Sequence, residues 1–372
     1  MAKFRIAWLP GDGVGNDVME AAKIVLDALK LDAEYIPGDI GWEFWRTEGD
    51  PLPTRTTELL KKTDCALFGA ITSKPKEEAE KELIPELQGK GMIYSSPIVR
   101  LRQEFNLRTN LRPCKAYKGN PLNYRDDIDL VVFRENTEDL YVGIEFHPLP
   151  EELMNMLTSM HPKMKKFSST ALDDIAVSLR IITRKAAQNI IRDAFLYAQK
   201  HGYKTVTVVE KPNVIRETSG LMVREARKIA KEFPGIELWE TNIDAMCMWL
   251  IKNPNDYGVL VTSNMFGDIL SDLCAQLVGG LGFACSGNIG DNYAVFEPTH
   301  GSAPKYAGQY KVNPIAMMLS CKLMLDWLEE LDKADKLEKA IATVIAEGKV
   351  KTYDMGGKST SLEVAEEIAR KL

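Results

Sequence analysis

Two acidic side chains close to residue 270 have the spacing of a metal site. Asp268 and Asp272 are four residues apart, and we expect a helix from about Gly267, after a buried strand over residues 257–262. On a helix this spacing places both carboxylates on one face, where they repel each other unless a cation lies between them. Carboxylate oxygens suit a hard divalent cation. The alternative is an exposed first helical turn, in which acids interact favourably with the helix dipole, and the pair alone leaves both interpretations open.

Three arginines that precede residue 140 could bind an acidic ligand. Arg102, Arg112 and Arg134 fall at the predicted edges of strands or helices. A guanidinium group binds a carboxylate through two parallel hydrogen bonds, so three that converged would hold a di- or tricarboxylic acid. Most arginines are instead solvated at the surface. Spacing alone does not show that these three converge.

Two apolar strands end in polar runs whose side chains can transfer protons. The strand over residues 129–134 leads into the polar run 134–141, which ends in Tyr141, and the strand over residues 205–210 leads into Lys211. A lysine whose pKa is lowered by its neighbours can act in proton transfer. Lys211 could equally be solvated, and Tyr141 could be an ordinary packing residue.

The glycine-rich turn over residues 10–17 is a weak candidate for a phosphate site. It lies between a predicted strand and a predicted helix, but its spacing is not G-x-G-x-x-G, the spacing that a dinucleotide-binding turn requires. Asp12 in this turn would also repel a phosphate. We therefore assign no dinucleotide fingerprint to it.

The candidate residues must be held in place by an alternation of strands and helices. Apolar runs predict strands over residues 4–9, 33–35, 65–70, 129–134, 205–210 and 257–262. Amphipathic runs predict helices over residues 18–29, 54–62, 98–104, 184–200, 220–232, 314–330, 337–347 and 361–370. This alternation is typical of the α/β class with a mostly parallel sheet. We expect residues 73–92 to be a charged surface excursion and residues 146–168 to form an arm or clasp.

Length and composition restrict the class of protein. A chain of 372 residues is longer than a single hydrophobic core usually accommodates, so two domains are expected. Its hydrophobic content of 45% is typical of a globular protein, and its net charge of −6 argues against a nucleic-acid partner. The apolar runs are too short to cross a membrane, and the absence of a secretory signal predicts a cytoplasmic location. Six scattered cysteines without a CxxC pair predict free thiols, without structural zinc or disulfides.

The motifs together resemble one family, the metal-dependent β-decarboxylating dehydrogenases, which include isocitrate, isopropylmalate and homoisocitrate dehydrogenases. The resemblance covers essentially the whole chain and is most specific in the runs 101–104, 110–113, 134–141, 267–272 and 300–304. It implies the α/β fold of that family, which is not a Rossmann fold. It also implies a large cofactor-binding domain over residues 1–107 and 279–372, and a small substrate, metal and dimer-interface domain over residues 108–278 with a clasp within about 142–183.

The resemblance also implies roles for the candidate residues. The substrate-binding side chains would be Ser96, Arg102, Arg112, Arg134, Tyr141, Lys211 and Asn213. Mg²⁺ or Mn²⁺ would be held by Asp268 and Asp272 with Asp244 from a second subunit, so the active unit would be a homodimer with shared active sites. Lys211, also from the second subunit, would take the substrate hydroxyl proton, and Tyr141 would protonate the enol carbon after carbon dioxide leaves.

The same resemblance implies a nicotinamide cofactor. Its contacts would be Thr72, His300, Gly301, Ser302, Ala303, Lys305, Tyr306, Asn313 and Tyr353. NAD-using members commonly carry an Asp where this chain has Lys305, and a lysine there would attract the 2′-phosphate of NADP. NADP is therefore favoured over NAD. NAD remains the alternative because Gly357 stands where the family has a further phosphate-binding arginine.

Substrate choice follows from the residues before the first arginine. Isocitrate enzymes typically carry Ser-x-Asn there, and this chain has Ser96 but Ile98 in place of the amide. We expect the substrate to be isocitrate, which would be oxidised and decarboxylated to 2-oxoglutarate in a reaction of the tricarboxylic acid cycle. Homoisocitrate and 3-isopropylmalate are the alternatives, because discrimination rests on a few pocket contacts. A regulatory subunit without turnover is disfavoured, because none of five residues is missing: Tyr141, Lys211, Asp244, Asp268 and Asp272.

Overall fold

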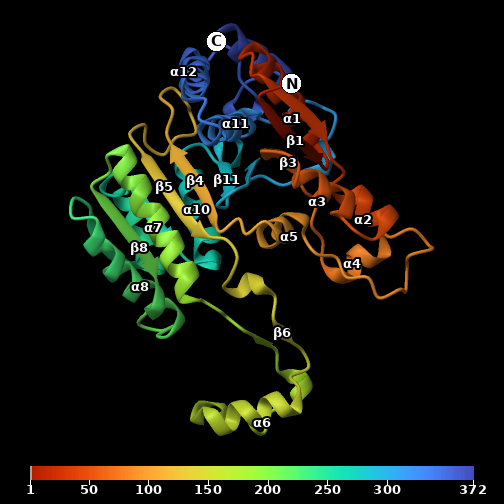
Figure 1. Cartoon of the computed structure of the whole chain (residues 1–372), viewed down its shortest axis with the longest axis vertical. Coiled ribbons are helices and arrows are strands. Elements are labelled where there is room, and N and C mark those ends of the chain that lie inside the picture. Colours follow the sequence, from red (N-terminus) through yellow and green to blue (C-terminus); the bar gives the residue numbers. More distant parts are fainter. Residues whose placement is uncertain (1) are drawn as a thin grey trace.

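A mixed β-sheet runs through the centre of the computed structural model, which describes residues 2–372 (Figure 1). In spatial order the ten strands of this sheet are β2 (Ala33–Pro37), β1 (Phe4–Gly11), β3 (Cys65–Ala70), β12 (Ala294–Pro298), β11 (Cys285–Ile289), β4 (Thr109–Lys115), β5 (Asp129–Glu135), β10 (Val259–Thr262), β8 (Thr205–Glu210) and β9 (Glu237–Asn242). The pairs β12–β11, β11–β4 and β4–β5 are antiparallel, and the other pairs are parallel. The predicted α/β class and mostly parallel sheet are confirmed, with an antiparallel centre that the sequence pattern did not predict.

Helices cover both faces of the sheet. One face packs with α1 (Val14–Ala28), α7 (Arg184–His201), α8 (Thr218–Ile229), α11 (Ile315–Trp327), α12 (Leu331–Glu347) and α13 (Ser361–Arg370). The other face packs with α3 (Thr54–Leu60), α5 (Pro97–Glu104), α9 (Ile243–Lys252) and α10 (Asn264–Leu277). Successive strand residues point to opposite faces, and in β10 Val259 and Val261 join one apolar cluster while Leu260 joins the other. Both faces are therefore buried, which explains why such strands read as continuous apolar runs.

The charged stretch 73–92 is not only a surface excursion, so that expectation is wrong in part. It contains the short helix α4 (Lys76–Lys81), and Ala79 and Leu83 are buried against α2 (Trp42–Glu48). The indole Nε1 of Trp45 donates to the Ala79 carbonyl at 2.8 Å. Two apolar residues in a charged run are too few to give a visible period, so the sequence pattern missed this contact.

Helix α10 begins at Asn264, three residues before the predicted start at Gly267. Ser263 has extended backbone dihedrals and takes the N-cap position, and the side chain of Asn264 donates to the Glu138 carbonyl at 3.1 Å. The polar residues that were read as a turn are thus the first helical turn. As a consequence Asp268 lies more than one turn inside the helix, beyond the reach of simple N-terminal capping.

The predicted arm is an extended segment between β5 and α7. It contains β6 (Glu145–Phe146), paired antiparallel with β7 (Val177–Ser178), and helix α6 (Glu151–Met160). Figure 1 shows α6 projecting away from the body of the molecule. Its role as a clasp stays a prediction.

Short 3₁₀ helices span Leu140–Val142 (η1), Pro162–Phe167 (η2), Leu172–Asp174 (η3), Ala230–Glu232 (η4), Pro254–Asp256 (η5), Leu281–Phe283 (η6), Pro304–Tyr306 (η7) and Tyr353–Met355 (η8).

The sheet is continuous across the predicted domain boundary. The two predicted domains meet where β11 pairs with β4, and Asn110 faces Asn288 in that register. Both side chains are fully buried, and Asn110 Nδ2 donates to Asn288 Oδ1 at 2.8 Å. The division into residues 1–107 with 279–372 and residues 108–278 stays a prediction.

The helices and cysteines agree with a protein built around this sheet. Among helices within residues 2–372, none combines the length and the apolar composition needed to cross a lipid bilayer. All six cysteines are free thiols, and five of them are buried.

Helix α10 approaches β5 so closely at Gly267 that we expect a side chain there to destabilise the protein. A Cβ atom there would lie 2.5 Å from Cγ of Arg134, and Arg134 is only 1% exposed and has no room to move aside. Gly267→Ala should lower the free energy of unfolding by about 1–3 kcal/mol through overpacking, although alanine favours helices. Urea unfolding measures the difference.

The matched control is Gly235→Ala, because a Cβ at Gly235 meets no atom within 4 Å. Its effect should stay within about 0.5 kcal/mol. A Gly267→Ala protein as stable as this control would contradict the close approach.

Candidate active site

Two of the predicted arginines converge on the acids of α10. Arg134 on β5 donates from Nη1 to Asp268 Oδ1 and from Nε to Asn264 Oδ1, the latter at 2.9 Å. Arg112 on β4 lies 3.7 Å from Asp268 Oδ1 through Nη2 and 3.3 Å from Asp272 Oδ1 through Nη1. The antiparallel register pairs Arg112 with residue 132, so Arg112 and Arg134 point to the same face of the sheet. The acids are therefore not an isolated solvated pair.

The third arginine is buried beside them. Arg102 on α5 donates from Nε to Asn288 Oδ1 at 2.9 Å, and its Nη2 is 3.4 Å from Glu297 Oε1. Burial, and then repulsion from Arg102 and Arg112, lowers the pKa of Arg134 to about 10. Arg134 thus stays cationic at neutral pH. Its Nη2 is buried and has no hydrogen-bond partner among residues 2–372, so the cluster keeps one donor that an additional anion would satisfy.

The two carboxylates of α10 have opposite electrostatic surroundings. Burial raises the pKa of Asp268, but attraction to Arg134, a hydrogen bond from Tyr141 and attraction to Arg112 outweigh it, so the net pKa lies below its ordinary value. Burial raises the pKa of Asp272, and Arg112 offsets this only in part. At neutral pH Asp268 is the more firmly ionised oxygen donor of the two.

Tyr141 lies at the edge of this cluster on η1. Its hydroxyl donates to Asp268 Oδ2, and the Arg134 guanidinium carbon lies 5.0 Å from the ring centroid. Burial, followed by the hydrogen bond to Asp268, raises the pKa of Tyr141 above its ordinary value. The phenol therefore keeps its proton at neutral pH and is available as an acid.

Lys211 and Asp244 form a separate pair. Lys211 follows β8, Asp244 lies in the first turn of α9, and Nζ donates to Oδ1 at 2.5 Å. This hydrogen bond lowers the pKa of Asp244. In the part of the chain that the structure describes, no three Asp, Glu, His or Cys side chains are grouped to hold a metal ion. Asn213 lies exposed two residues after Lys211. The participation of these residues in a second subunit's site stays a prediction.

The first predicted cofactor residues meet where the segment after β3 contacts the loop after β12, beside the turn after β1. The hydroxyl oxygens of Thr72 and Ser302 are 2.6 Å apart. Asp12 in the turn accepts hydrogen bonds from the backbone N–H of Thr72 at 2.8 Å and of Trp42 at 2.7 Å. The aspartate that disfavoured a phosphate site is thus satisfied by backbone donors. Nε2 of His300 is buried and lacks a partner within the described residues, and Gly301 and Ala303 flank Ser302 in the same loop.

Three further cofactor candidates form an aromatic and cationic group. Lys305 Nζ lies 4.8 Å from the ring centroid of Tyr306, and the rings of Tyr306 and Tyr353 are 6.1 Å apart. Asn313 Nδ2 donates to Asp354 Oδ2 at 3.0 Å. The positions that the resemblance assigned to one ligand therefore lie together.

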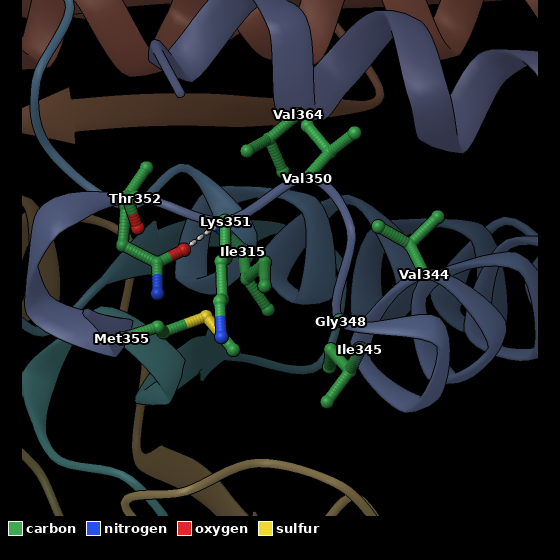
Figure 2. A pocket seen from close by; sticks show the side chains of 10 residues that line it. Ile315, Val344, Ile345, Gly348, Val350, Lys351, Thr352, Met355 and Val364 are labelled. Atoms are coloured by element: carbon green, nitrogen blue, oxygen red, sulfur yellow. Dashed lines mark hydrogen bonds between the residues drawn. The ribbon is translucent and has the colours of Figure 1, made fainter. Parts of the chain in front are cut away.

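A small apolar pocket borders this group (Figure 2). Figure 2 shows Ile315, Val344, Met355 and Val364 around it, and the backbone N–H of Ile315 donates to Asn313 Oδ1 at 3.0 Å. None of the arginines or acids described above lines this pocket. It supports the loop that carries Asn313 and is separate from the arginine cluster.

The residues before Arg102 do not all face a ligand. Ser96 is the N-cap residue of α5, and within the described residues its hydroxyl makes no capping hydrogen bond. Ile98 is 8% exposed and belongs to the same apolar cluster as Leu52 and Leu101. Ser96 is therefore free to contact a ligand, whereas Ile98 is committed to the core.

Comparison with known proteins identifies the family. The family model for isocitrate/isopropylmalate dehydrogenase matches residues 5–369. The chain belongs to this family. Its members are metal-dependent β-decarboxylating dehydrogenases that use NAD or NADP, bind small carboxylic acids and typically dimerise. The predicted family is confirmed.

Individual relatives span different substrates. The 3-isopropylmalate dehydrogenase of Methanothermobacter thermautotrophicus is 43% identical over 372 residues, which cover 100% of this chain and 99% of that protein. Protein DlpA of Legionella pneumophila is 38% identical over 98% of this chain, which spans only 58% of that protein. The crystal structure of isocitrate dehydrogenase from Methylococcus capsulatus superposes with a TM-score of 0.85 at 35% identity and 99% coverage of both chains.

Sequence reasoning missed one residue that organises the site. Asn288 on β11 is fully buried, and its Oδ1 accepts hydrogen bonds from Arg102, Asn110 and Asn136. It is a single amide in a glycine-rich stretch without period or motif. Only the antiparallel pairing of β11 with β4 brings it to the arginines, so no local signal could have found it.

The loop around Gly357 is too tightly packed for the arginine that the family has at this position. A Cβ at Gly357 would lie 1.9 Å from the Lys351 carbonyl oxygen, and Gly357 N–H donates to the Thr352 carbonyl at 2.9 Å. Gly357→Arg should therefore lower the free energy of unfolding by at least about 1–3 kcal/mol, without lowering KM for NADP. Denaturant unfolding and steady-state kinetics measure both quantities.

Lys358→Arg is the matched control, because it places an arginine at an exposed neighbouring position. Its stability should change by less than about 0.5 kcal/mol. A stable Gly357→Arg protein with tighter NADP use would contradict this interpretation of the loop.

Proposed function

We propose that the chain oxidises and decarboxylates a 3-substituted malate, with isocitrate as the first candidate. Isocitrate, homoisocitrate and 3-isopropylmalate all share a malate core with two carboxylates and one hydroxyl. The observation that carries the proposal is the burial of Arg102, Arg112 and Arg134 around Asp268, with an unpartnered donor on Arg134. Buried cations of this number call for anionic partners, and carboxylates match the guanidinium fork.

The donor set at α10 fits a hard divalent cation. Asp268 and Asp272 supply oxygen ligands one helical turn apart, which suits Mg²⁺ or Mn²⁺. Asp244 is 67% exposed and would complete the set from a second subunit. A bound divalent cation would stabilise negative charge that develops on the substrate oxygen.

The chain's own side chains account for the remaining steps. The arginines would bind the substrate carboxylates and fix the malate core. Lys211 from the second subunit would accept the hydroxyl proton while C2 loses hydride to the nicotinamide. Loss of carbon dioxide from the C3 carboxylate leaves an enol, and Tyr141 would donate a proton to C3 because its raised pKa keeps the phenol protonated.

The cofactor residues favour NADP. Lys305 Nζ lies over the ring of Tyr306, and a cation at this position attracts the 2′-phosphate that distinguishes NADP from NAD. The closed loop at Gly357 leaves this phosphate with Lys305 but without the further arginine of the family. The unpartnered Nε2 of His300 and the hydroxyls of Thr72 and Ser302 offer polar contacts to the rest of the cofactor.

The third substituent of the malate decides between substrates. The hydroxyl of Ser96 is free at the start of α5, which favours a carboxylate-bearing substituent such as that of isocitrate or homoisocitrate. 3-Isopropylmalate is the second candidate, because a relative with 43% identity is a 3-isopropylmalate dehydrogenase. The active unit is proposed to be a homodimer held by the segment 142–183 and the domain over residues 108–278.

Substrate specificity is tested by kcat/KM for the three candidate acids, each with NAD and NADP and with Mn²⁺. We expect isocitrate with NADP to be the best pair, and the other acids to be lower by about 10–200-fold. Malate, which lacks the third substituent, is the matched control. Faster turnover of 3-isopropylmalate would select the second candidate. No reduction of either cofactor with any acid would refute the proposed function and leave the regulatory-subunit alternative.

The proposed base predicts the effect of Lys211→Met. Removal of the amine should lower kcat by about 10²–10⁴-fold, the usual contribution of general acid–base catalysis, while the Mn²⁺ affinity measured by calorimetry changes far less. Lys204→Met, at an exposed lysine just before β8, is the control and should keep wild-type kcat. Unchanged turnover in Lys211→Met would remove Lys211 from the mechanism.

A further inference from the structure

Arg180 lies in a buried polar cluster that none of the proposed catalytic steps uses. It follows β7, and its Nε donates to Asp139 Oδ1 at 2.6 Å while Nη2 lies 3.4 Å from Glu210 Oε2. Asp139 and Glu210 are both completely buried. One guanidinium group therefore joins two carboxylates that would otherwise repel each other in a region of low dielectric.

The same guanidinium group also contacts hydroxyl groups. Nη2 donates to Ser263 Oγ at 2.7 Å, and Nη1 donates to Ser219 Oγ at 3.0 Å and Thr218 Oγ1 at 3.1 Å. Its face packs against the ring of Phe266, with 4.9 Å between the guanidinium carbon and the ring centroid. Every donor nitrogen of Arg180 is thus used within the protein.

The partners of Arg180 stand next to the residues with proposed chemical roles. Asp139 is two residues before Tyr141, Glu210 immediately precedes Lys211, and Ser263 occupies the N-cap position of the helix that carries Asp268. These three segments are far apart in the sequence. They meet at one side chain.

The two carboxylates that Arg180 holds also accept hydrogen bonds from the backbone of these segments. Asp139 Oδ2 accepts from the Met265 N–H at 3.0 Å, and Glu210 Oε1 accepts from the Ser263 N–H at 2.9 Å. Asp139 also has a positive φ of 70°, a conformation that costs energy in a residue with a side chain and persists only where its surroundings fix it. The direction in which the chain enters η1 therefore depends on the carboxylate that Arg180 holds.

We propose that Arg180 is a positioning residue. It fixes the acid and the metal-binding helix of its own subunit's site, together with the base that its subunit contributes to the other site. The inference rests on the proposed function, because it assigns Tyr141, Asp268 and Lys211 their roles from there. A solely stabilising pair would not need all three segments, and apolar side chains often replace a buried ion pair without loss of stability.

The test compares Arg180→Met with Arg108→Met. Arg108 is a matched control because it is also half-buried and paired with two carboxylates, Asp193 and Asp291, neither of which adjoins a proposed catalytic residue. Both changes should lower Tm. Only Arg180→Met should lower kcat by about 100-fold or more, the cost of a displacement on the order of 1 Å among reacting groups, with KM changed much less.

A second measurement reports on Tyr141 directly. In D₂O, proton delivery from a fixed phenol places deuterium on one face of product C3, and immediate reduction of the product preserves this configuration for NMR. Wild-type protein and Arg108→Met should give one configuration, and Arg180→Met should give both. Arg180→Lys, which keeps the charge but not the fork, should recover part of kcat and of the stereospecificity.

The outcomes separate the two proposals. Wild-type turnover of one acid from the substrate panel is required by the proposed function alone. If wild-type protein is active, then wild-type kcat and one product configuration in folded Arg180→Met would overturn the role of Arg180, as would an equal loss of kcat in Arg108→Met. If Arg180→Met does not fold, Arg180→Lys and Ser263→Ala replace it. Unchanged kcat and stereospecificity in both would overturn the proposal equally.

Discussion

The ion pair between Arg134 and Asp268 is the interaction on which the rest of the site depends. Arg134 is almost fully buried, and it enters the cluster from β5 inside the sheet, so a lost partner would leave a buried charge unpaired. Asp268 holds it there, together with Tyr141, and Arg112 approaches the same carboxylate from the neighbouring strand. Arg102 lies beside them and pairs with Glu297, while Nη2 of Arg134 has no partner within the described residues and is the donor that an incoming carboxylate would satisfy.

The antiparallel centre of the sheet makes this arrangement available. If β4 and β5 were parallel, the strands that carry Arg112 and Arg134 would have to be joined by a long crossover connection. Here β4 and β5 are antiparallel neighbours, so the two side chains lie on one face, and β11 adds Asn288 on the other edge of β4. Helix α10 closes the cluster because Gly267 allows it to approach β5 closely. The outer parallel strands then carry the loops with the proposed cofactor contacts on one side and Lys211 on the other.

Much of this could be predicted from the sequence, and the rest could not for physical reasons. Strong periodicity gave the α/β class and most helices, and motif runs gave the family and the residues around Asp268. The start of α10 was missed because Asn264 reads as a turn residue until its side chain finds partners in β5 and the following loop. Helix α9, which carries Asp244, was not predicted at all. The partners of Arg180 and the burial of Ile98 depend on tertiary contacts, which leave no trace in local spacing.

The cluster around Arg180 has a consequence for how independent two active sites can be. Under the proposed arrangement Tyr141 and Asp268 serve the site of their own subunit, whereas Lys211 serves the site of the other. One guanidinium group would then adjust the acid of one catalytic centre and the base of the next. A mixed dimer with a single altered Arg180 would contain no intact centre: one would lack a well-placed acid, and the other a well-placed base. One altered subunit would therefore impair both active sites of the dimer. A wild-type subunit could not restore activity to an Arg180 variant through a mixed dimer.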